Sequence, residues 1–181
     1  IEVEAAAKAG AQIIDVLGTA TDATIAECIQ AGKNYGAKIA VDLIAVADPV
    51  ARAKQVEALG ADYISVHVAI DEQMRGQDPF AILSEVSRAV HVPVGVAGGI
   101  NSETAAAAVA HGAAYVIVGG AITKALDPAA ATQEIRRALD EGVVIPTTLF
   151  KRAGEEEIRR VLEMVSAANL SDALHRGGVL E

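Results

Sequence analysis

The stretch VAGGINSETAAAAVAHGAAYVIVGGAI, residues 96–122, contains two apolar runs that each end in a pair of glycines. The pairs are Gly98-Gly99 and Gly119-Gly120, and an alanine-rich helical segment separates them. Two apolar runs joined by a helical segment are typical of neighbouring parallel strands with a crossover helix. The stretch therefore predicts a strand–helix–strand unit in which both glycine pairs lie at the same edge of a parallel sheet.

The same plan recurs along the chain. The segments KAGAQIIDVLG, ALGADYISVHV and AHGAAYVIVGG each place a glycine between the end of a helix and an apolar strand. Gly10, Gly60 and Gly112 recur about every fifty residues and Gly36 falls midway between the first two, so the unit is about 25 residues long. Strands are expected at residues 12–18, 38–46, 63–68, 92–99 and 115–120, and helices at residues 22–35, 49–59, 79–90, 102–111 and 128–139. This alternation predicts an α/β fold with a parallel sheet.

The expected strands have two unlike faces. One side-chain parity is aliphatic throughout, whereas the other carries Asp15, Asp42, Ser65, His67 and Gly95. Small or polar residues facing inward, beneath an outer helix layer packed on aliphatic residues, are typical of a (β/α)8 TIM barrel near its active end. An open doubly wound sheet would instead bury aliphatic residues on both faces. A complete barrel needs roughly 200 residues, so we expect the last five strand–helix units in residues 1–141 and three strands before Ile1.

The residues after the expected barrel follow another pattern. Residues 142–154, GVVIPTTLFKRAG, resemble a linker, and residues 155–181 contain two helical stretches, 155–165 and 169–176, with no partner strand. This tail is expected either to pack through an amphipathic face on the barrel or a neighbour, or to begin a second domain.

Composition excludes several classes of function. With 24 acidic and 15 basic residues the net charge is −9, and no run of Lys and Arg exceeds a pair, so no nucleic acid partner is expected. No apolar run reaches the roughly 18 residues needed to span a bilayer, and no membrane partner is expected. The single cysteine, Cys28, lies in a helical pattern and is expected to be a buried packing residue.

The glycine pairs predict a phosphate site. At the carboxyl ends of the last strands of a barrel, residues without side chains let backbone N–H groups point at a ligand, and phosphate sites are built there with a helix N-terminus behind them. We expect a phosphate between Gly98-Gly99 and Gly119-Gly120, near the start of a helix at Ser102. The alternative is that both pairs only make tight turns.

Polar residues of the inward parity are candidates for catalysis. His67 ends a strand, where it would act as a general acid or base, or would be a structural residue. Asp42 would contact a substrate or pair with a Lys from a strand expected before Ile1, and the lower position of Asp15 favours a structural role. Acidic residues of the following loop, Asp71 and Glu72, are expected to be solvated or to cap the site.

Several of these motifs, taken in order, resemble one family. AVDLIAVADPVARAKQVEALGADYISVHVAIDEQMRGQDP and VGVAGGINSETAAAAVAHGAAYVIVGGAIT are similar to the 3-hexulose-6-phosphate synthase family of the orotidine 5′-phosphate decarboxylase superfamily. The resemblance implies a lyase that condenses formaldehyde with ribulose 5-phosphate in a reversible aldol reaction through a Mg²⁺-stabilised enediolate. The related 3-keto-L-gulonate-6-phosphate decarboxylases carry Arg residues just after the strand-end His, and HVAID here has none, which favours the synthase.

The resemblance also implies roles for residues. His67 matches the acid/base residue, and Gly98, Gly99, Gly119 and Gly120 match the phosphate grip. Many relatives have Arg where this chain has Gly120, so the charged phosphate contact is missing. The Asp-x-Lys-x-x-Asp motif and the Mg²⁺ carboxylates are expected upstream of Ile1, so no metal ligand is expected here and the chain alone is expected to be inactive. A cytoplasmic homodimer is implied.

Two further interpretations stay open. The chain is either part of this aldolase barrel or a non-catalytic phosphate-binding or assembly module. In the tail, VSAANLSDAL resembles the opening of the family of the regulator of ribonuclease activity A.

Overall fold

The computed structural model describes residues 1–67, 79–147 and 155–165. The chain divides into two compact units, Ile1–Thr147 and Thr148–Glu181. The first unit contains the sheet and the candidate site, and each unit is described by itself.

Five strands form one sheet in the first unit. They are β1 (Ile13–Leu17), β2 (Lys38–Asp42), β3 (Tyr63–His67), β4 (Val94–Ala97) and β5 (Tyr115–Ile117). The helices of this unit are α1 (Glu2–Lys8), α2 (Asp22–Tyr35), α3 (Pro49–Leu59), α5 (Pro79–Ala89), α6 (Ala105–Ala110), α7 (Gly120–Thr123) and α8 (Pro128–Glu141). All five expected strands are present, and α2 and α3 have the expected bounds.

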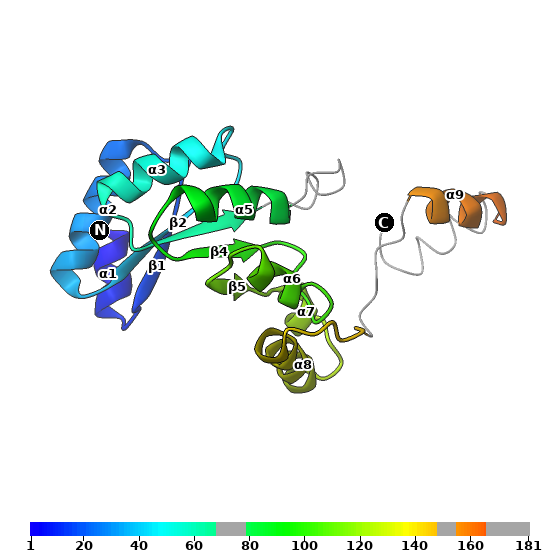
Figure 1. The fold of residues 1–181 in the computed structure, drawn as a ribbon. Coiled ribbons are helices and arrows are strands. Elements are labelled where there is room, and N and C mark those ends of the chain that lie inside the picture. The colour runs from blue at the N-terminus through cyan, green and yellow to red at the C-terminus, as the bar shows by residue number, and fades with distance from the viewer. Residues whose placement is uncertain (68–78, 148–154, 166–181) are drawn as a thin grey trace. The chain divides into compact units, whose positions relative to one another are not determined.

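The sheet is parallel and its strands follow chain order, β1-β2-β3-β4-β5. A doubly wound sheet reverses its strand order at a switch point, and no reversal occurs among the described strands. The helix α2 contacts β1 and β2, and α5 contacts β3 and β4 (Figure 1). Winding in a single direction, with one covered face, is the geometry of part of a (β/α)8 barrel, which confirms the expected fold class.

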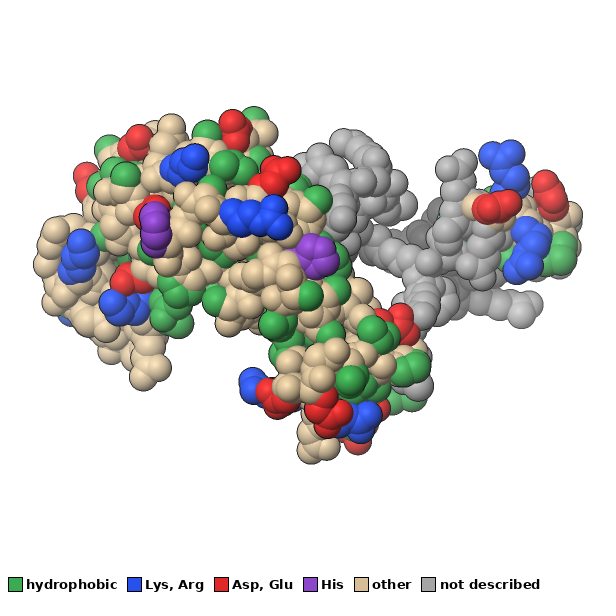
Figure 2. All heavy atoms as spheres, viewed as in Figure 1, with side chains coloured by type: hydrophobic (Ala, Val, Ile, Leu, Met, Phe, Trp, Pro, Cys, Tyr) green, Lys and Arg blue, Asp and Glu red, His purple; other side chains and the backbone are tan. Residues whose placement is uncertain are grey.

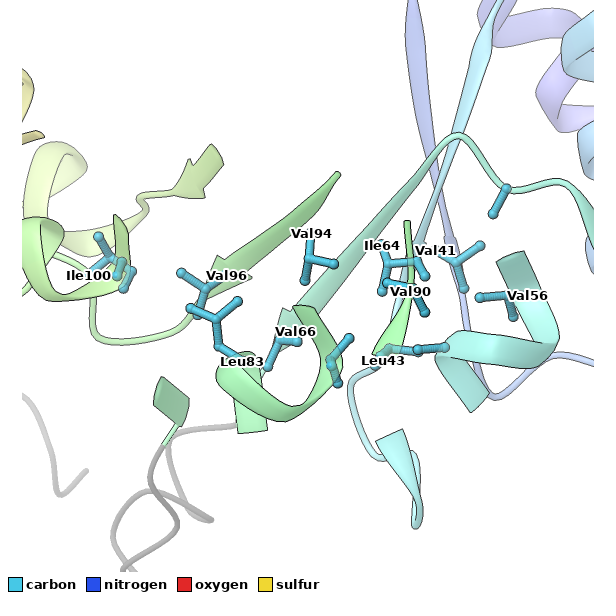
Figure 3. Close-up of a cluster of buried hydrophobic side chains, with 14 of the residues drawn as sticks. Val41, Leu43, Val56, Ile64, Val66, Leu83, Val90, Val94, Val96 and Ile100 are labelled. Atoms are coloured by element: carbon cyan, nitrogen blue, oxygen red, sulfur yellow. The ribbon is translucent and has the colours of Figure 1, made fainter. Parts of the chain in front are cut away.

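The aliphatic parity forms the core between sheet and helices. Side chains of this parity on the three central strands are at most 3% exposed, as Figure 3 shows for several of them. They are Ile39, Val41, Ile64, Val66, Val94 and Val96. Residues of the helices, such as Val56 and Leu83, close the same cluster and are fully buried. Burying each such side chain stabilises the fold by about 1.5–3 kcal/mol, so this layer holds the strands in register.

The strands end earlier than the sequence predicts, for local reasons. Strand β2 stops at Asp42 because its side chain accepts a hydrogen bond from the N–H of Ile44 and the chain then turns through Ala45, whose φ is 58°. Strand β4 stops at Ala97 because Gly98 and Gly99 both have positive φ, 96° and 72°. Only glycine adopts this conformation at little cost.

The opposite, inner face of the sheet is uneven. On β1 the side chains of Ile13 and Leu17 are 56% and 55% exposed, whereas Ser65 at the centre is 1% exposed. The ring of Tyr115 lies on this face above Gly95, and its hydroxyl donates to the carbonyl of Ile64 at 2.9 Å. The absence of a side chain at Gly95 is therefore explained by the aromatic ring that fills the space.

The first unit continues past α8. The hydroxyl of Ser102 donates to the carbonyl of Ile145 at 2.8 Å, and the N–H of Ile145 donates back to the carbonyl of Ser102 at 3.1 Å. Both residues are buried, at 3% and 9% exposed. The segment after α8 is thus fixed against the loop that follows the first glycine pair.

The second unit contributes one described helix, α9 (Glu155–Glu163), within the expected range 155–165. The expected helix at 169–176 and the resemblance of VSAANLSDAL lie outside the described residues, as do Asp71 and Glu72. Among the helices of the described ranges, none is long and apolar enough to cross a bilayer.

Candidate active site

Two of the inward-facing polar residues form a pair at the carboxyl ends of β2 and β3. The Nδ1 atom of His67 lies 2.9 Å from Oδ2 of Asp42. Both side chains are partly buried, with 32% of His67 and 16% of Asp42 exposed. A carboxylate at Nδ1 fixes the imidazole with its Nδ1 proton toward Asp42, which leaves Nε2 as the atom that can exchange a proton with a ligand.

The loop after β2 holds the carboxylate of Asp42 in place. Its second oxygen, Oδ1, accepts a hydrogen bond from the N–H of Ile44 at 2.8 Å. Both oxygens therefore have partners, and the carboxylate plane is set by the backbone rather than by solvent. Asp42 thus lies where it orients His67. The sequence alone had left the role of Asp42 open between a substrate contact and a structural ion pair.

Asp15 lies near this pair on the inner face of β1. Partial burial and the neighbouring charge of Asp42 raise the pKa of Asp15, while the N–H of Val16 and the charge of His67 lower it to a smaller extent. Burial also raises the pKa of Tyr115, and the charges of Asp15 and Asp42 add to this effect. The inner face near β1 and β2 is therefore electronegative.

The two glycine pairs follow the same ends of the neighbouring strands β4 and β5. The strands pair up to Ala97 and Ile117, so each glycine pair begins one or two residues beyond the last paired position. Within residues 1–67 and 79–147, no hydrogen bond uses the backbone N–H groups of these four glycines. Four unused donors at one edge of a sheet can together bind an anion.

The expected helix at Ser102 is not behind this site. Helix α6 begins at Ala105, and the residues before it form a turn. The side-chain oxygen of Asn101 accepts hydrogen bonds from the N–H groups of Glu103 and Thr104, and the carbonyl of Asn101 accepts from Ala105. The prediction of a helix beginning at Ser102 was wrong because the oxygens of Asn101 hold residues 101–104 in a turn. The N–H groups of Glu103 and Thr104 are bonded within this turn and are not available to a ligand.

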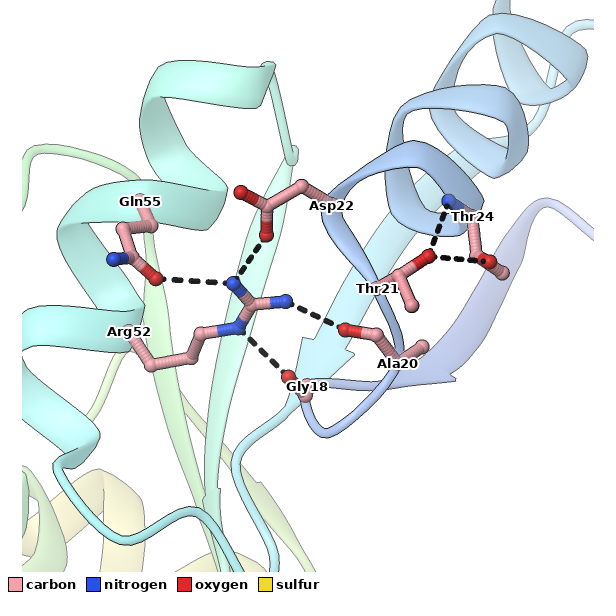
Figure 4. A network of polar contacts seen from close by, with 7 residues as sticks. All are labelled: Gly18, Ala20, Thr21, Asp22, Thr24, Arg52 and Gln55. Carbon is pink, nitrogen blue, oxygen red and sulfur yellow. Dashed lines mark hydrogen bonds and ion pairs between the residues drawn. The ribbon is translucent and has the colours of Figure 1, made fainter.

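A side chain that the sequence did not single out fixes another loop at this edge. Arg52 of α3 donates through Nε to the carbonyl of Gly18 and through Nη2 to that of Ala20, both at 2.7 Å (Figure 4). It also contacts the carboxylate of Asp22 and the side chain of Gln55. Arg52 therefore joins the loop after β1 to the first turns of α3. Its only sequence signal is a basic residue one turn after an Asp-Pro helix start, which is common on surfaces.

A cavity of about 460 Å³ lies beside the same region. Its lining includes Val66, His67, Ile82 and residues 43 and 45–50 of the loop after β2 and the start of α3. Because Val66 and Ile82 belong to the layer between strands and helices, this cavity lies behind the strands. Neither glycine pair lines it, so it meets the candidate site only through His67.

The charges on the face drawn in Figure 2 do not form a large basic area. Acidic and basic side chains are interspersed over the face drawn in Figure 2. In the ranges that the structure describes, no three His, Cys, Asp or Glu side chains form a group that could hold a metal ion. The described residues therefore do not by themselves form a three-ligand metal site.

The fold and the position of the site define a (β/α)8-barrel protein whose polar residues gather at the carboxyl ends of its strands. Residues 1–135 match the orotidine 5′-phosphate decarboxylase / HUMPS family, and the chain belongs to this family.

Individual relatives narrow the comparison. The 3-hexulose-6-phosphate synthase of Mycobacterium gastri is 41% identical over 140 residues, which cover 77% of this chain and 67% of that protein. The crystal structure of 3-hexulose-6-phosphate synthase from Salmonella typhimurium is similar with a TM-score of 0.72 at 37% identity, covering 78% of this chain and 68% of that one. The chain thus spans about two thirds of the length of these relatives.

The decarboxylase alternative has weaker support. A structure of 3-keto-L-gulonate-6-phosphate decarboxylase from Vibrio cholerae is similar with a TM-score of 0.66 at 22% identity, covering 80% of this chain and 67% of that one. At this identity the likeness shows the shared fold alone.

Proposed function

We propose that this chain forms part of a 3-hexulose-6-phosphate synthase, which joins formaldehyde to ribulose 5-phosphate to give D-arabino-hex-3-ulose 6-phosphate. The observation that carries the proposal is the pairing of His67 with Asp42 on the same sheet edge as four glycines whose N–H groups form no hydrogen bond with the described residues. The sequence identity to proteins of that name supports the choice of reaction.

In the proposed reaction the glycine pairs bind the phosphate and His67 moves a proton. A proton leaves C1 of ribulose 5-phosphate, and the resulting enediolate carbon attacks the carbon of formaldehyde. The C=O bond of formaldehyde becomes a hydroxyl by taking up a proton, so the overall reaction is balanced. Nε2 of His67 is the atom proposed to exchange protons with the substrate, with Asp42 stabilising the charged imidazolium. The cofactor Mg²⁺, which stabilises the enediolate when bound, is proposed from the family resemblance only.

The test separates phosphate binding from proton transfer. Kinetics are measured in a chimaera that carries, ahead of Ile1, the N-terminal third of the Mycobacterium gastri enzyme. Gly119→Val is expected to raise KM for ribulose 5-phosphate, because a Cβ at Gly119 meets no atom of the protein within 4 Å and only a ligand would be obstructed. His67→Ala is expected to lower kcat by about 10²–10⁴-fold with a smaller change in KM, as for loss of a general acid or base.

The alternatives predict other outcomes. Release of CO₂ from 3-keto-L-gulonate 6-phosphate, without condensation of formaldehyde, would favour the decarboxylase. Binding of ribulose 5-phosphate without turnover in the chimaera would favour a non-catalytic module. A KM that is unchanged in Gly119→Val would mean that the glycine pairs are only turns.

The remaining parts of this proposal come from the family alone. They are the cytoplasmic location, the homodimer and the use of formaldehyde. The resemblance of the tail to the regulator of ribonuclease activity A stays a separate prediction, and it has no part in the proposed reaction.

A further inference from the structure

Gly120 stands where many relatives have Arg, and the structure brings the side chain of a lysine to this glycine. Lys124 follows α7 directly, four residues after Gly120, and its N–H donates to the carbonyl of Gly120 at 3.1 Å. In this one-turn helix, residues four apart lie on the same side, and long side chains lean back toward the N-terminal end. The side chain of Lys124 is therefore directed at the second glycine pair.

The distances agree with this direction. Cδ and Cε of Lys124 lie 3.7 and 3.8 Å from the position that a Cβ of Gly120 would occupy. The aliphatic part of the lysine thus covers the glycine, and the ammonium group is one bond beyond Cε. Because Gly120 has no side chain, the lysine reaches the N-terminal end of α7 without obstruction.

The same turn leaves its N–H groups unused. The carbonyl of Gly119 accepts from the N–H groups of Ile122 and Thr123, and the carbonyl of Gly120 accepts from Lys124. The N–H groups of both glycines take no part in these bonds or in any other among the described residues. The aliphatic stem of Lys124 therefore lies against the same turn as these donors, at the end of β5.

Lys124 shares with Lys33 and Lys54 the lack of an ion pair among the described residues, whereas two other lysines of the first unit are paired. Lys8 is paired with Glu4, and Lys38 is paired with Asp62 at 2.7 Å. In the described ranges, Lys124 forms no ion pair with a carboxylate. A protein with a net charge of −9 needs a local cation to hold a doubly charged anion, and this ammonium group is available.

We propose that Lys124 binds the phosphate group of the substrate, in the role that the missing arginine would otherwise have. The inference rests on the proposed function, because it assumes that an anion lies between Gly98-Gly99 and Gly119-Gly120. The inference adds that the positive charge of the site is supplied by a lysine one helical turn after β5 and not by a residue at the end of the strand. An ammonium acts as a point charge without fixed bidentate geometry, so the site accepts inorganic phosphate as well as a sugar phosphate.

The experiment measures binding of inorganic phosphate and of ribulose 5-phosphate to the full chain by calorimetry. Lys124→Gln is expected to raise both dissociation constants about ten- to hundredfold, which is the effect of losing one charge-assisted hydrogen bond. Lys124→Arg is expected to stay within about threefold of the unchanged chain, since the charge is kept. Lys54→Gln on α3 is the matched control, because it removes the same charge from another exposed lysine and should bind as the unchanged chain does.

Gly119→Val distinguishes the two levels of the argument. If Gly119→Val abolishes binding while Lys124→Gln binds normally, the phosphate site is real and the role of Lys124 is refuted. If neither substitution changes binding, or if the unchanged chain binds neither anion, the phosphate site itself fails and the inference fails with it. Lys124 is exposed, and circular dichroism of its variants is expected to match that of the unchanged chain.

Discussion

Replacement of Arg52 by Met tests whether the loop after β1 depends on a side chain from α3. The substitution keeps most of the aliphatic stem and removes the guanidinium, which is largely buried with 14% of the side chain exposed. The carbonyls of Gly18 and Ala20 then lose their donors. The loop would remain connected to β2 mainly through the N–H of Gly18, which donates to the carbonyl of Asp42 at 2.7 Å.

The magnitude follows from how accessible each acceptor is. Gly18 is buried, so its carbonyl left without a donor costs about 1–3 kcal/mol. Ala20 is half-buried and water can replace the guanidinium there, so that bond contributes about 0.5–1.5 kcal/mol. Asp22 is 62% exposed, and its ion pair with Arg52 adds about 0–1 kcal/mol. We expect the free energy of unfolding to fall by about 2–4 kcal/mol.

The assay is urea unfolding of the full chain followed by far-ultraviolet circular dichroism. The control is Arg136→Met, which breaks a surface pair with Asp140 on α8 and is expected to cost at most about 0.5 kcal/mol. Arg52→Lys should fall between the two, because one ammonium cannot reach both carbonyls with the geometry of a guanidinium. If Arg52→Met unfolds at the same urea concentration as Arg136→Met, the loop is held by its own backbone and the reasoning is refuted.

Four further predictions concern the sheet, three of them its inner face and one, at Asp62, the residue just before β3. Partial burial and the charge of Asp42 raise the pKa of Asp15 in the folded chain. The stabilising contribution of protonated Asp15 is therefore present below the pKa of the unfolded chain and is lost as the pH rises through the pKa of the folded chain. At pH 7 Asp15→Asn should consequently be more stable than the unchanged chain. Burial acts to raise the pKa of Asp62, but hydrogen bonds from Lys38 and Ile39 outweigh it and lower that pKa. Asp62→Asn should therefore be less stable than the unchanged chain at pH 7, and the difference should shrink in acid. If the urea midpoints of Asp15→Asn and Asp62→Asn change in the same way with pH, both predictions are contradicted. Gly95→Ala should lower the free energy of unfolding by about 1–3 kcal/mol because its Cβ would overlap the ring of Tyr115. Gly119→Ala should melt at the same temperature as the unchanged chain. Equal melting temperatures for the two variants would count against this packing. The exposed Ile13 and Leu17 on the edge strand β1 should make the chain self-associate, and light scattering that finds only a monomer of 18.5 kDa would exclude this.

Much of the fold could be predicted because the sequence repeats one local pattern. The glycines that end helices are legible, and Gly36 and Gly60 indeed have positive φ, 78° and 100°. The Asp-Pro starts were equally informative, since Asp48 and Asp127 each accept a hydrogen bond at the first turn of their helix. These are short-range interactions, so they act in the same way wherever the unit occurs in the chain.

The candidate site was predicted less completely because it depends on distances between strands. Asp42 and His67 share one parity on neighbouring strands, but only the register, in which Asp42 is opposite Ser65, brings the two side chains together. The helix α7 was missed because four residues give no periodicity, and without that helix Lys124 has no reason to lie near Gly120. Strand order and parity are therefore readable, whereas side-chain pairing across strands is not.

The order of the strands gives the proposed site an electrostatic direction. Carboxylates of Asp15 and Asp42 lie on β1 and β2, and unused N–H groups with Lys124 follow β4 and β5. A phosphate is repelled at the first end and attracted at the second, so a sugar phosphate has one favoured orientation on the inner face. In the proposed orientation we expect the carbonyl end of the sugar to lie toward β3, where Nδ1 of His67 is held by Asp42 and Nε2 is left to meet the substrate. On this proposal the charge of the substrate selects which of its carbons meets the imidazole, and we expect a sugar without phosphate to lose that selection as well as affinity.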